Sequence, residues 1–279
     1  MKINTTKIGE HFDYTYLSLG AGVQSSALLV LACQGKVPMP DAAIFADTGD
    51  EPQYVYDYLK VLTAYAEPYG IEVVTAQKGV LSESVIARQK DGKRFVSVPV
   101  FTQQADGSRG MLRRQCTREY KITPILKKVR ELLGYKPRQR MKHKVRAMLG
   151  ITIDEAQRMK PAWHKWVINT WPLVDLGLHR DDCYGIVEEA GLPEPQRSAC
   201  VYCPYHSDTY WQWMKDKHPE EFTKAVEFDE SIRGMTQKGM DLPAFVHGSC
   251  VPLSEAVFDT GNPNQVDMFN NECEGMCGV

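Results

Sequence analysis

The first eighty residues alternate between short segments rich in β-branched or aromatic residues and longer amphipathic segments, and this alternation strongly constrains the fold. The strand-like segments are Tyr14–Leu19, 41–46 and 71–75, and the helix-like segments between them are 23–35 and 53–70. Strands that alternate with helices over short links form parallel units. The sequence therefore predicts an α/β fold, a parallel sheet with helices on both faces.

The rest of the chain divides less clearly. Residues 77–110 are mixed in character and predict a long excursion near the active site. A helix is expected at 123–133 and a strand at 145–151, and Thr152-Ile-Asp-Glu155 has the spacing of a capping box that opens the next helix. We expect a nucleotide-binding domain over 1–197. Residues 198–279 then form a C-terminal region that completes a metal-cluster site and ends in a flexible tail.

Composition excludes several classes of protein. The 279 residues are 43% hydrophobic, enough for a core, and the net charge of −2 gives no global attraction to nucleic acid. The N-terminus lacks the features of a signal peptide, and 18 apolar residues never run together. Eight cysteines in such a chain favour metal or redox chemistry over disulfides, so a cytoplasmic protein is expected.

A glycine turn follows the first strand. Glycines let backbone N–H groups approach an anion, and the start of the next helix adds unpaired donors and a favourable dipole. The sequence has no Walker lysine and no third glycine of a dinucleotide fingerprint, and a simple tight turn is the alternative. The residues expected to bind nucleotide here are Ser18, Gly20, Gly22, Gln24, Ser25 and Ser26.

Three motifs in order resemble the PP-loop ATP pyrophosphatases, in the branch that includes phosphoadenosine phosphosulfate reductases. Gly20-Ala-Gly-Val-Gln-Ser25 is similar to Ser-Gly-Gly-x-Asp-Ser, with Gln24 at the acidic position. Asp47-Thr48-Gly49 resembles the Asp-Thr-Gly turn that lines the nucleotide pocket in the family. Leu149-Gly-Ile151 followed by Arg158 resembles the Gly-Ile-Arg segment of this branch.

The resemblance implies an adenine nucleotide α-hydrolase-like fold and an ATP-dependent activity. The loop would bind the pyrophosphate of ATP, with Mg²⁺ offsetting its charge. A substrate oxygen would attack the α-phosphate, giving an adenylated substrate and pyrophosphate. Positioning and charge stabilisation would carry most of this step.

Three cysteines suggest a metal site. Cys200 and Cys203 form a Cys-x-x-Cys pair, and Cys116 stands alone between arginines. The sulfur-transferring PP-loop enzymes that modify tRNA have this arrangement, which implies a 4Fe–4S cluster with one open iron. Zinc, completed by Cys183 or His206, and unligated thiols are the alternatives.

The C-terminus carries a further candidate. Glu272-Cys273 resembles the Glu-Cys-Gly tail whose cysteine is the nucleophile of the reductases, although Glu274 follows here. Cys273 and Cys277 are also a candidate relay pair for redox chemistry or sulfur. The alternative is a solvent-exposed tail with incidental cysteines.

Cations occupy every second position from Lys136 to Arg146. In an extended segment they would share one face, able to grip nucleic-acid phosphates or pyrophosphate, or to protect a sheet edge. Arg146 is the cation expected to contact ATP. Five tryptophans, Trp163 among them, are candidates for stacking on bases or for the core.

Three functions follow from these patterns. The first is an adenylating enzyme that prepares a substrate, a nucleobase in tRNA or DNA, for sulfur transfer, using Cys116, Arg146 and Cys273. The second is a sulfonucleotide reductase that depends on Cys273, and the third is a module that senses ATP or binds nucleic acid without catalysis. A sulfur-donor protein and a homodimer remain open as partners.

Overall fold

A computed structural model describes residues 11–90, 98–104, 106–234 and 242–261. Its central sheet has five parallel strands in the order β3 (Glu72–Gln77), β2 (Ala42–Asp47), β1 (Tyr14–Leu19), β6 (Val145–Met148) and β7 (Val167–Thr170). The register pairs β1 with both β2 and β6, so β1 lies at the centre. The parallel α/β sheet expected from the sequence is confirmed.

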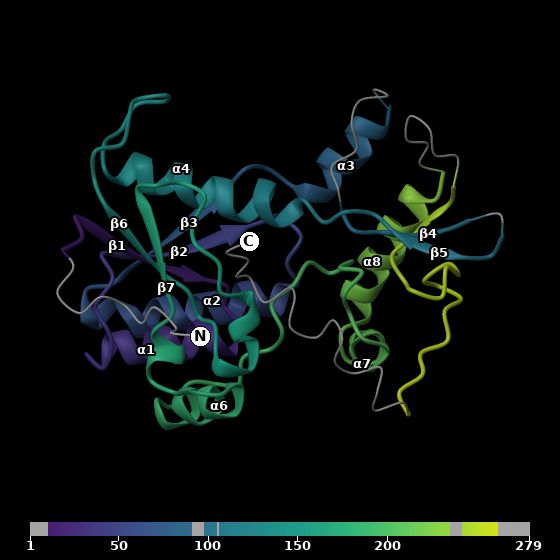
Figure 1. Cartoon of the computed structure of the whole chain (residues 1–279). Coiled ribbons are helices and arrows are strands. Elements are labelled where there is room, and N and C mark those ends of the chain that lie inside the picture. The colour runs from purple at the N-terminus through teal and green to yellow at the C-terminus, as the bar shows by residue number, and fades with distance from the viewer. Residues whose placement is uncertain (1–10, 91–97, 105, 235–241, 262–279) are drawn as a thin grey trace.

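Helices cover both faces of this sheet (Figure 1). One face packs against α1 (Val23–Cys33), α2 (Gln53–Ala66) and α6 (Arg180–Glu189). The other packs against α4 (Thr123–Leu132), whose first turn continues a π-helix, η2 (Thr117–Ile122). Strands β1 and β2 are mainly apolar because they are buried on both sides, whereas the edge strand β3 is largely exposed or half-buried.

A second lobe combines segments that lie far apart in the sequence (Figure 1). Its helices and strands are α3 (Leu81–Lys90), α7 (Asp208–Lys217), α8 (Pro219–Ile232), β4 (Phe101–Gln103), β5 (Arg109–Met111) and β8 (Ala244–Phe245). The three strands form an antiparallel sheet in the order β5-β4-β8, over a core shared by these elements. The excursion after residue 77 is therefore largely a part of this lobe.

Short helices complete the connections. They are η1 (Glu67–Tyr69), η3 (Ile153–Arg158) and α5 (Pro172–Asp175). The capping box expected at Thr152 is wrong, because the Thr152 side chain caps nothing and η3 is a 3-10 helix with a break at Glu155. The division at residue 197 stays a prediction. Within the described ranges, no helix has the length and apolar character needed to cross a bilayer.

Candidate functional site

A cavity of about 920 Å³ lies over the face of the sheet that α4 covers. Side chains alternate along β1, so Leu17 and Leu19 pack towards α1 while Tyr16 and Ser18 face the cavity. Leu149 and Asn169 continue the floor from the neighbouring strands. The cavity thus reaches the carboxyl end of the parallel sheet, where such folds place their ligands.

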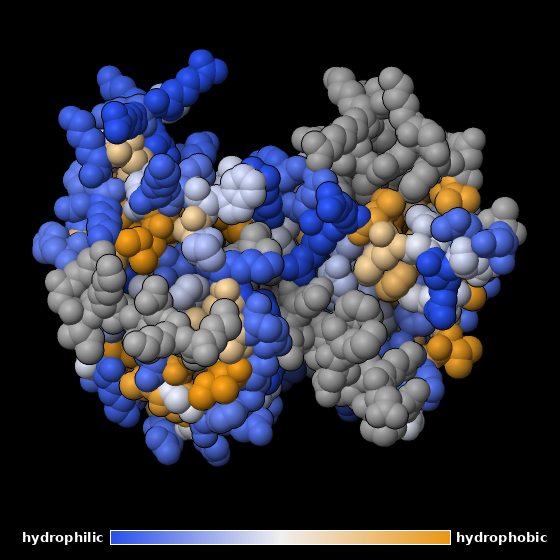
Figure 2. Space-filling view, viewed as in Figure 1, coloured by the Kyte–Doolittle hydropathy of each residue, from blue (hydrophilic) through white to orange (hydrophobic). Residues whose placement is uncertain are grey.

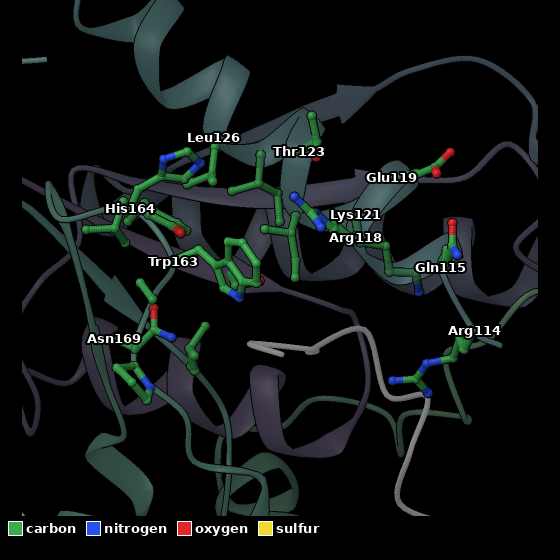
Figure 3. A pocket seen from close by; sticks show the side chains of 18 of the residues that line it. Arg114, Gln115, Arg118, Glu119, Lys121, Thr123, Leu126, Trp163, His164 and Asn169 are labelled. Carbon is green, nitrogen blue, oxygen red and sulfur yellow. The ribbon is translucent and has the colours of Figure 1, made fainter. Parts of the chain in front are cut away.

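Four cations from one short segment line this cavity, Arg113, Arg114, Arg118 and Lys121, and Figure 3 labels the last three. Arg118 and Lys121 are held by η2, and π-helical turns are frequent at functional sites. Among the described residues, Glu119 is the one acidic residue that lines the same cavity. This wall is suited to an anionic ligand such as a polyphosphate.

The glycine turn lies between the end of β1 and α1. Gly20 N–H donates to Ser25 Oγ at 3.1 Å, and the Ser25 and Ser26 hydroxyls donate to the Gly22 carbonyl at 3.1 and 2.8 Å. Ala21 has φ of 60°, a left-handed conformation that is strained for alanine. Gly20 to Ser26 are all buried, so of the predicted loop only Ser18 lines the cavity.

A buried polar network joins the first turn of α1 to η3. Gln24 Nε2 donates to Thr152 Oγ1 at 2.9 Å and to Glu155 Oε2 at 3.0 Å. Arg158 pairs with the same carboxylate oxygen at 2.7 Å. The structure therefore brings the predicted residue Arg158 towards the N-terminus of α1, through Glu155.

The turn after β2 connects the sheet to the cysteines. Asp47 accepts hydrogen bonds from Gly49 N–H at 2.7 Å and from the Tyr56 hydroxyl at 2.8 Å, which fixes the turn. Thr48 lines a small cavity that is also lined by Cys116, Cys200 and Cys203, the cysteine cavity. Gly49 borders a different pocket, so neither residue lines the large cavity. Their expected role in nucleotide binding stays a prediction.

Cys116, Cys200 and Cys203 line one small cavity, although about 84 residues separate the first two in sequence. Cys200 Sγ lies 3.2 Å from Thr48 Oγ1, and Val201 N–H donates to the Asp50 carbonyl at 2.9 Å. These contacts hold the Cys-x-x-Cys segment against the turn after β2. The three cysteines singled out in the sequence are thus neighbours of one cavity.

Burial dominates the electrostatics of the cysteine cavity. It raises the pKa of the Cys200 thiol well above its ordinary value, with Glu51 adding to the effect and Lys121 opposing it. Burial also raises the pKa of Asp50, while hydrogen bonds from Tyr202 at 2.5 Å and from Ser82 oppose that rise. In the absence of a metal, Cys200 is therefore a protonated thiol at neutral pH.

The two residues offered to complete a zinc site take other positions. Cys183 lies on α6 in the core against α1. This core is on the face of the sheet opposite the large cavity, so Cys183 is not a ligand partner of the other three cysteines. His206 accompanies them, but its Nε2 contacts the Cys200 carbonyl at 3.0 Å and its ring stacks on Tyr210. Burial holds the pKa of His206 well below its ordinary value.

The three thiols have the right donor atoms for a metal, but their side chains are not arranged around a metal position. Three cysteine side chains are the donors of a thiolate-bound metal or cluster. Across the described ranges, however, His, Cys, Asp and Glu side chains form no group of three or more arranged to hold a metal ion. No disulfide joins any two of the six described cysteines.

Arg146 does not reach the glycine turn. It pairs with Thr15 in the sheet register, near the start of β1, and its guanidinium lies 4.2 Å from the centre of the Phe12 ring. Strands rise about 3.3 Å per residue, so the turn at Gly20 is roughly 16 Å further along. Arg146 thus lies at the opposite end of the strand from the glycine turn, and its expected contact with ATP stays a prediction.

The alternating cations also lack the expected extended conformation. Strand β6 begins only at Val145, and the segment 135–144 is a loop. The Arg130 guanidinium donates to the carbonyls of Lys136 and Gln139, and the Tyr135 hydroxyl lies 2.7 Å from His143 Nδ1. Proline at 137 and these internal bonds favour a turn over a strand.

Cys273 and Cys277 lie outside the described residues, so their roles stay predictions. Sequence reasoning also missed Glu51 as the partner of Lys121, and Asn169 as a residue of the cavity wall, whereas Trp163, a candidate for stacking, does line it. Glu51 follows the Asp-Thr-Gly turn and Lys121 follows Cys116, so both stood beside recognised motifs. No sequence pattern indicated that Glu51 and Lys121, which are 70 residues apart, would form a pair.

These features define a class of protein: a parallel α/β fold with a glycine turn after the first strand and a cationic cavity at the carboxyl end of the sheet. No family model and no curated protein matches the chain. Among solved structures, it is similar to a phosphoadenylyl-sulfate (PAPS) reductase from Candida auris in a phosphate complex, at 16% identity. That match covers 66% of this chain and 76% of the reductase with a TM-score of 0.42.

Proposed function

We propose that this protein is an adenylating enzyme that converts ATP to AMP and pyrophosphate while it activates a substrate for sulfur transfer. One observation carries the proposal: Arg114 and Lys121 line both the large cavity and the cysteine cavity. A nucleotide bound in the first cavity would therefore share two cationic side chains with the cavity of the thiols. This is the proximity that sulfur transfer to an adenylated atom needs.

The proposed first step is an in-line displacement at the α-phosphorus. An oxygen of the acceptor attacks, the bond to the bridging oxygen between the α- and β-phosphates breaks, and pyrophosphate leaves. Exchange of the activated oxygen for sulfur then releases AMP. Arg114, Arg118 and Lys121 would stabilise the charge that develops on the phosphates. Mg²⁺ would bind chiefly through phosphate oxygens.

Cys116, Cys200 and Cys203 would hold the iron–sulfur cluster of the proposed enzyme, with zinc as the alternative metal. When bound, such a cluster with an open iron would supply a sulfide as the nucleophile that replaces the activated oxygen, with AMP as the leaving group. The cavity between the thiols holds only about 20 Å³, room for about one water molecule. Binding of a cluster would therefore move these side chains apart, while Arg114 and Lys121 offset its negative charge.

The acceptor in this proposal is a nucleobase in tRNA or DNA. Support comes from the exposed cations Lys136, Arg138, Arg140 and Lys142 on the loop between α4 and β6, which Figure 2 shows as a hydrophilic projection. Such a loop attracts phosphates even though the whole chain is slightly acidic. A separate sulfur-donor protein and a homodimer remain part of the proposal.

The products of ATP turnover test the first step. The full chain, purified without oxygen, is incubated with Mg²⁺ and α-labelled ATP with and without bulk tRNA. AMP and pyrophosphate are expected. ADP and phosphate, or bound ATP that is never cleaved under any of these conditions, would contradict the proposal, and the second result would favour a sensing module.

Metal content tests the cysteine site independently of turnover. Single Cys116→Ala, Cys200→Ala and Cys203→Ala variants are each expected to lose most of the bound iron and its visible absorbance. Cys33→Ala is the matched control, because Cys33 is buried on α1 in the core of the other sheet face. If all three variants retained iron, or if the protein contained zinc in place of iron, the proposed iron–sulfur cluster at these cysteines would be excluded.

The reductase hypothesis is tested by truncation. A chain that ends at Asn271 lacks Cys273 and Cys277, so a reductase that uses Cys273 would lose all sulfite release from phosphoadenosine phosphosulfate. An adenylating enzyme is expected to keep ATP cleavage after this truncation. Sulfite release by the full chain but not by the truncated chain would favour the reductase.

A further inference from the structure

The position of Trp163 points to a second ligand in the large cavity. Its side chain is 83% exposed, whereas Trp211 is fully buried and Trp166, Trp171 and Trp213 are half-buried. A single exposed apolar residue is ordinary on a protein surface. Trp163 differs because it lies on the wall of the 920 Å³ cavity.

A cation reaches the Trp163 ring from across the cavity. The Arg118 guanidinium carbon lies 4.9 Å from the ring centre (Figure 3). The two residues come from separate elements, η2 and the segment before β7. Arginine over an indole is a cation–π pair, and both groups stack well on planar bases.

The inner part of the cavity already offers a place for the adenine of ATP. Ile122, Ile125, Leu149 and Val167 form an apolar wall close to Ser18 at the end of β1. A volume of about 920 Å³ is near the upper end for sites that hold one small ligand. The exposed Trp163 rim is therefore available to a second ring while ATP occupies the interior.

The basic loop is joined to the segment that carries this tryptophan. Val145 N–H, directly after the loop, donates to the Trp166 carbonyl at 2.8 Å. Four cations of the loop, at 136, 138, 140 and 142, are exposed. A chain of phosphates that followed these cations would approach the cavity beside Trp163.

We propose that Trp163 and Arg118 form a stacking subsite for one unpaired base of a single-stranded nucleic acid, whose phosphates contact the loop 136–142. The identification of this base as the acceptor rests on the proposed function. Its binding does not, because stacking needs neither ATP cleavage nor the cysteines.

The test compares a base with no base at the stacking position. Fluorescence anisotropy measures the affinity of the full chain for a labelled twelve-nucleotide single strand, as RNA and as DNA, and for the same strands made abasic at central positions. Trp163→Ala is expected to bind the normal strand about tenfold more weakly or worse, and Trp163→Phe to recover part of the loss. Neither change should affect the abasic strand comparably.

Two further variants serve as controls. Tyr69→Ala removes another exposed aromatic residue, 42% exposed at the end of η1 and outside the cavity, and is expected to bind like the wild type. The triple variant R138A/R140A/K142A is expected to weaken binding of normal and abasic strands equally and to reduce its salt dependence. The RNA and DNA strands show which nucleic acid is preferred.

Equal wild-type affinity for normal and abasic strands, or no binding at all, would overturn the proposal. So would a Trp163→Ala variant that loses affinity for ATP but not for the normal strand, because Trp163 would then belong to the ATP subsite. A wild-type chain that shows Trp163-dependent binding but never forms AMP would count against the proposed ATP cleavage and leave the stacking subsite intact.

Discussion

Lys121 Nζ lies 3.2 Å from Glu51 Oε1, and the two side chains are only 9% and 1% exposed. Lys121 comes from η2 and Glu51 from the turn after β2, where Thr48 Oγ1 also donates to Glu51 at 3.4 Å. Because Lys121 lines both cavities, this ion pair is part of the partition between them.

Glu51→Gln is expected to destabilise the protein by about 3–5 kcal/mol, because it removes the charge that compensates a buried lysine. Glu51→Gln combined with Lys121→Met should recover most of that stability. Urea unfolding followed by circular dichroism measures both. Lys60→Met is the control: Lys60 and Asp57 form an exposed pair, worth at most about 1 kcal/mol. Equal effects of Glu51→Gln and Lys60→Met would show that the buried pair has no special weight.

Gly150→Ala tests the contact between the loop after β6 and the first turn of α1. A Cβ at this position would lie 2.9 Å from the Ser25 nitrogen and 3.0 Å from two backbone atoms of Gln24, so the helix start must shift. We expect a loss of about 1–3 kcal/mol and weaker ATP binding, measured by thermal unfolding and by calorimetry.

The matched control is Gly185→Ala on α6, where an added Cβ would meet nothing within 4 Å. Alanine is the better helix former, so this change is expected to stabilise the protein by up to about 1 kcal/mol. A Gly150→Ala variant that is as stable as the control and binds ATP normally would contradict the close packing.

Asp229 joins α8 to the chain that follows it. Its side chain is 1% exposed, pairs with Arg233, and accepts backbone hydrogen bonds from Val246 at 2.8 Å and Leu253 at 3.0 Å. Asp229→Ala would leave the half-buried Arg233 and two buried N–H groups without this acceptor. A loss of at least about 2 kcal/mol in the free energy of unfolding is expected. Asp216→Ala, which removes an exposed contact to Gln212, should cost less than about 0.5 kcal/mol.

A pH-dependent ion pair caps α6. His179 Nδ1 lies 2.7 Å from Asp154 Oδ1, and Asp154 also accepts from Arg180 N–H at 2.7 Å. The hydrogen bond with Asp154 raises the pKa of His179 above 6.5, and the same bond lowers the pKa of Asp154 below 3.8. The stabilisation that comes from protonated His179 is fully present below pH 6.5, and the stabilisation that comes from ionised Asp154 is fully present above pH 3.8. Both therefore stabilise the folded protein between these two pH values.

Asp154→Asn is therefore expected to lower Tm more at pH 5.5 than at pH 9, because the stabilisation is lost as pH rises through the raised pKa of His179. Proton NMR titration of His179 should show its pKa moving back towards 6.5 in the variant. An unchanged titration of His179 would exclude Asp154 as the cause of the shift.

The sequence predicted the parts of the fold that local pattern determines. Strands β1 and β2 and helix α1 are buried on nearly every side, so they appear as continuous apolar runs that end at glycine or aspartate. The β4–β5–β8 sheet was not predictable in this way. Its strands have three, three and two residues, and β8 joins β4 from more than 100 residues away.

The candidate site shows the same contrast between residues that a local pattern identifies and contacts that join distant segments. The cysteines were identified because each lay in a recognisable local pattern, and one cavity brings them together. The alternating charges from Lys136 onwards resemble a strand, whereas Arg130 and Tyr135 hold that segment as a loop and β6 begins only at Val145. Contacts of this kind between distant segments cannot be deduced from residue spacing.

Gln24 provides the sharpest contrast between motif and structure. The family motif has an acidic residue here, and Gln24→Glu would restore it. In the structure, however, Gln24 Nε2 donates to Glu155 Oε2 at 3.0 Å, and both side chains are buried. The amide is a donor to a carboxylate, and a second carboxylate in its place would repel the first.

Gln24→Glu is therefore expected to lower the free energy of unfolding at pH 8. The lost buried hydrogen bond costs about 1–3 kcal/mol, and the loss is larger if both carboxylates stay charged. The new carboxyl group would have a raised pKa, so the deficit should shrink as pH falls and the group becomes a donor again. Thermal unfolding at pH 5 and pH 8 measures this. Gln24→Glu combined with Glu155→Gln exchanges donor and acceptor, and it should regain stability at pH 8. If the single variant were more stable than the wild type at pH 8, the acidic residue of the motif, and not Glu155, would be the group that this position requires.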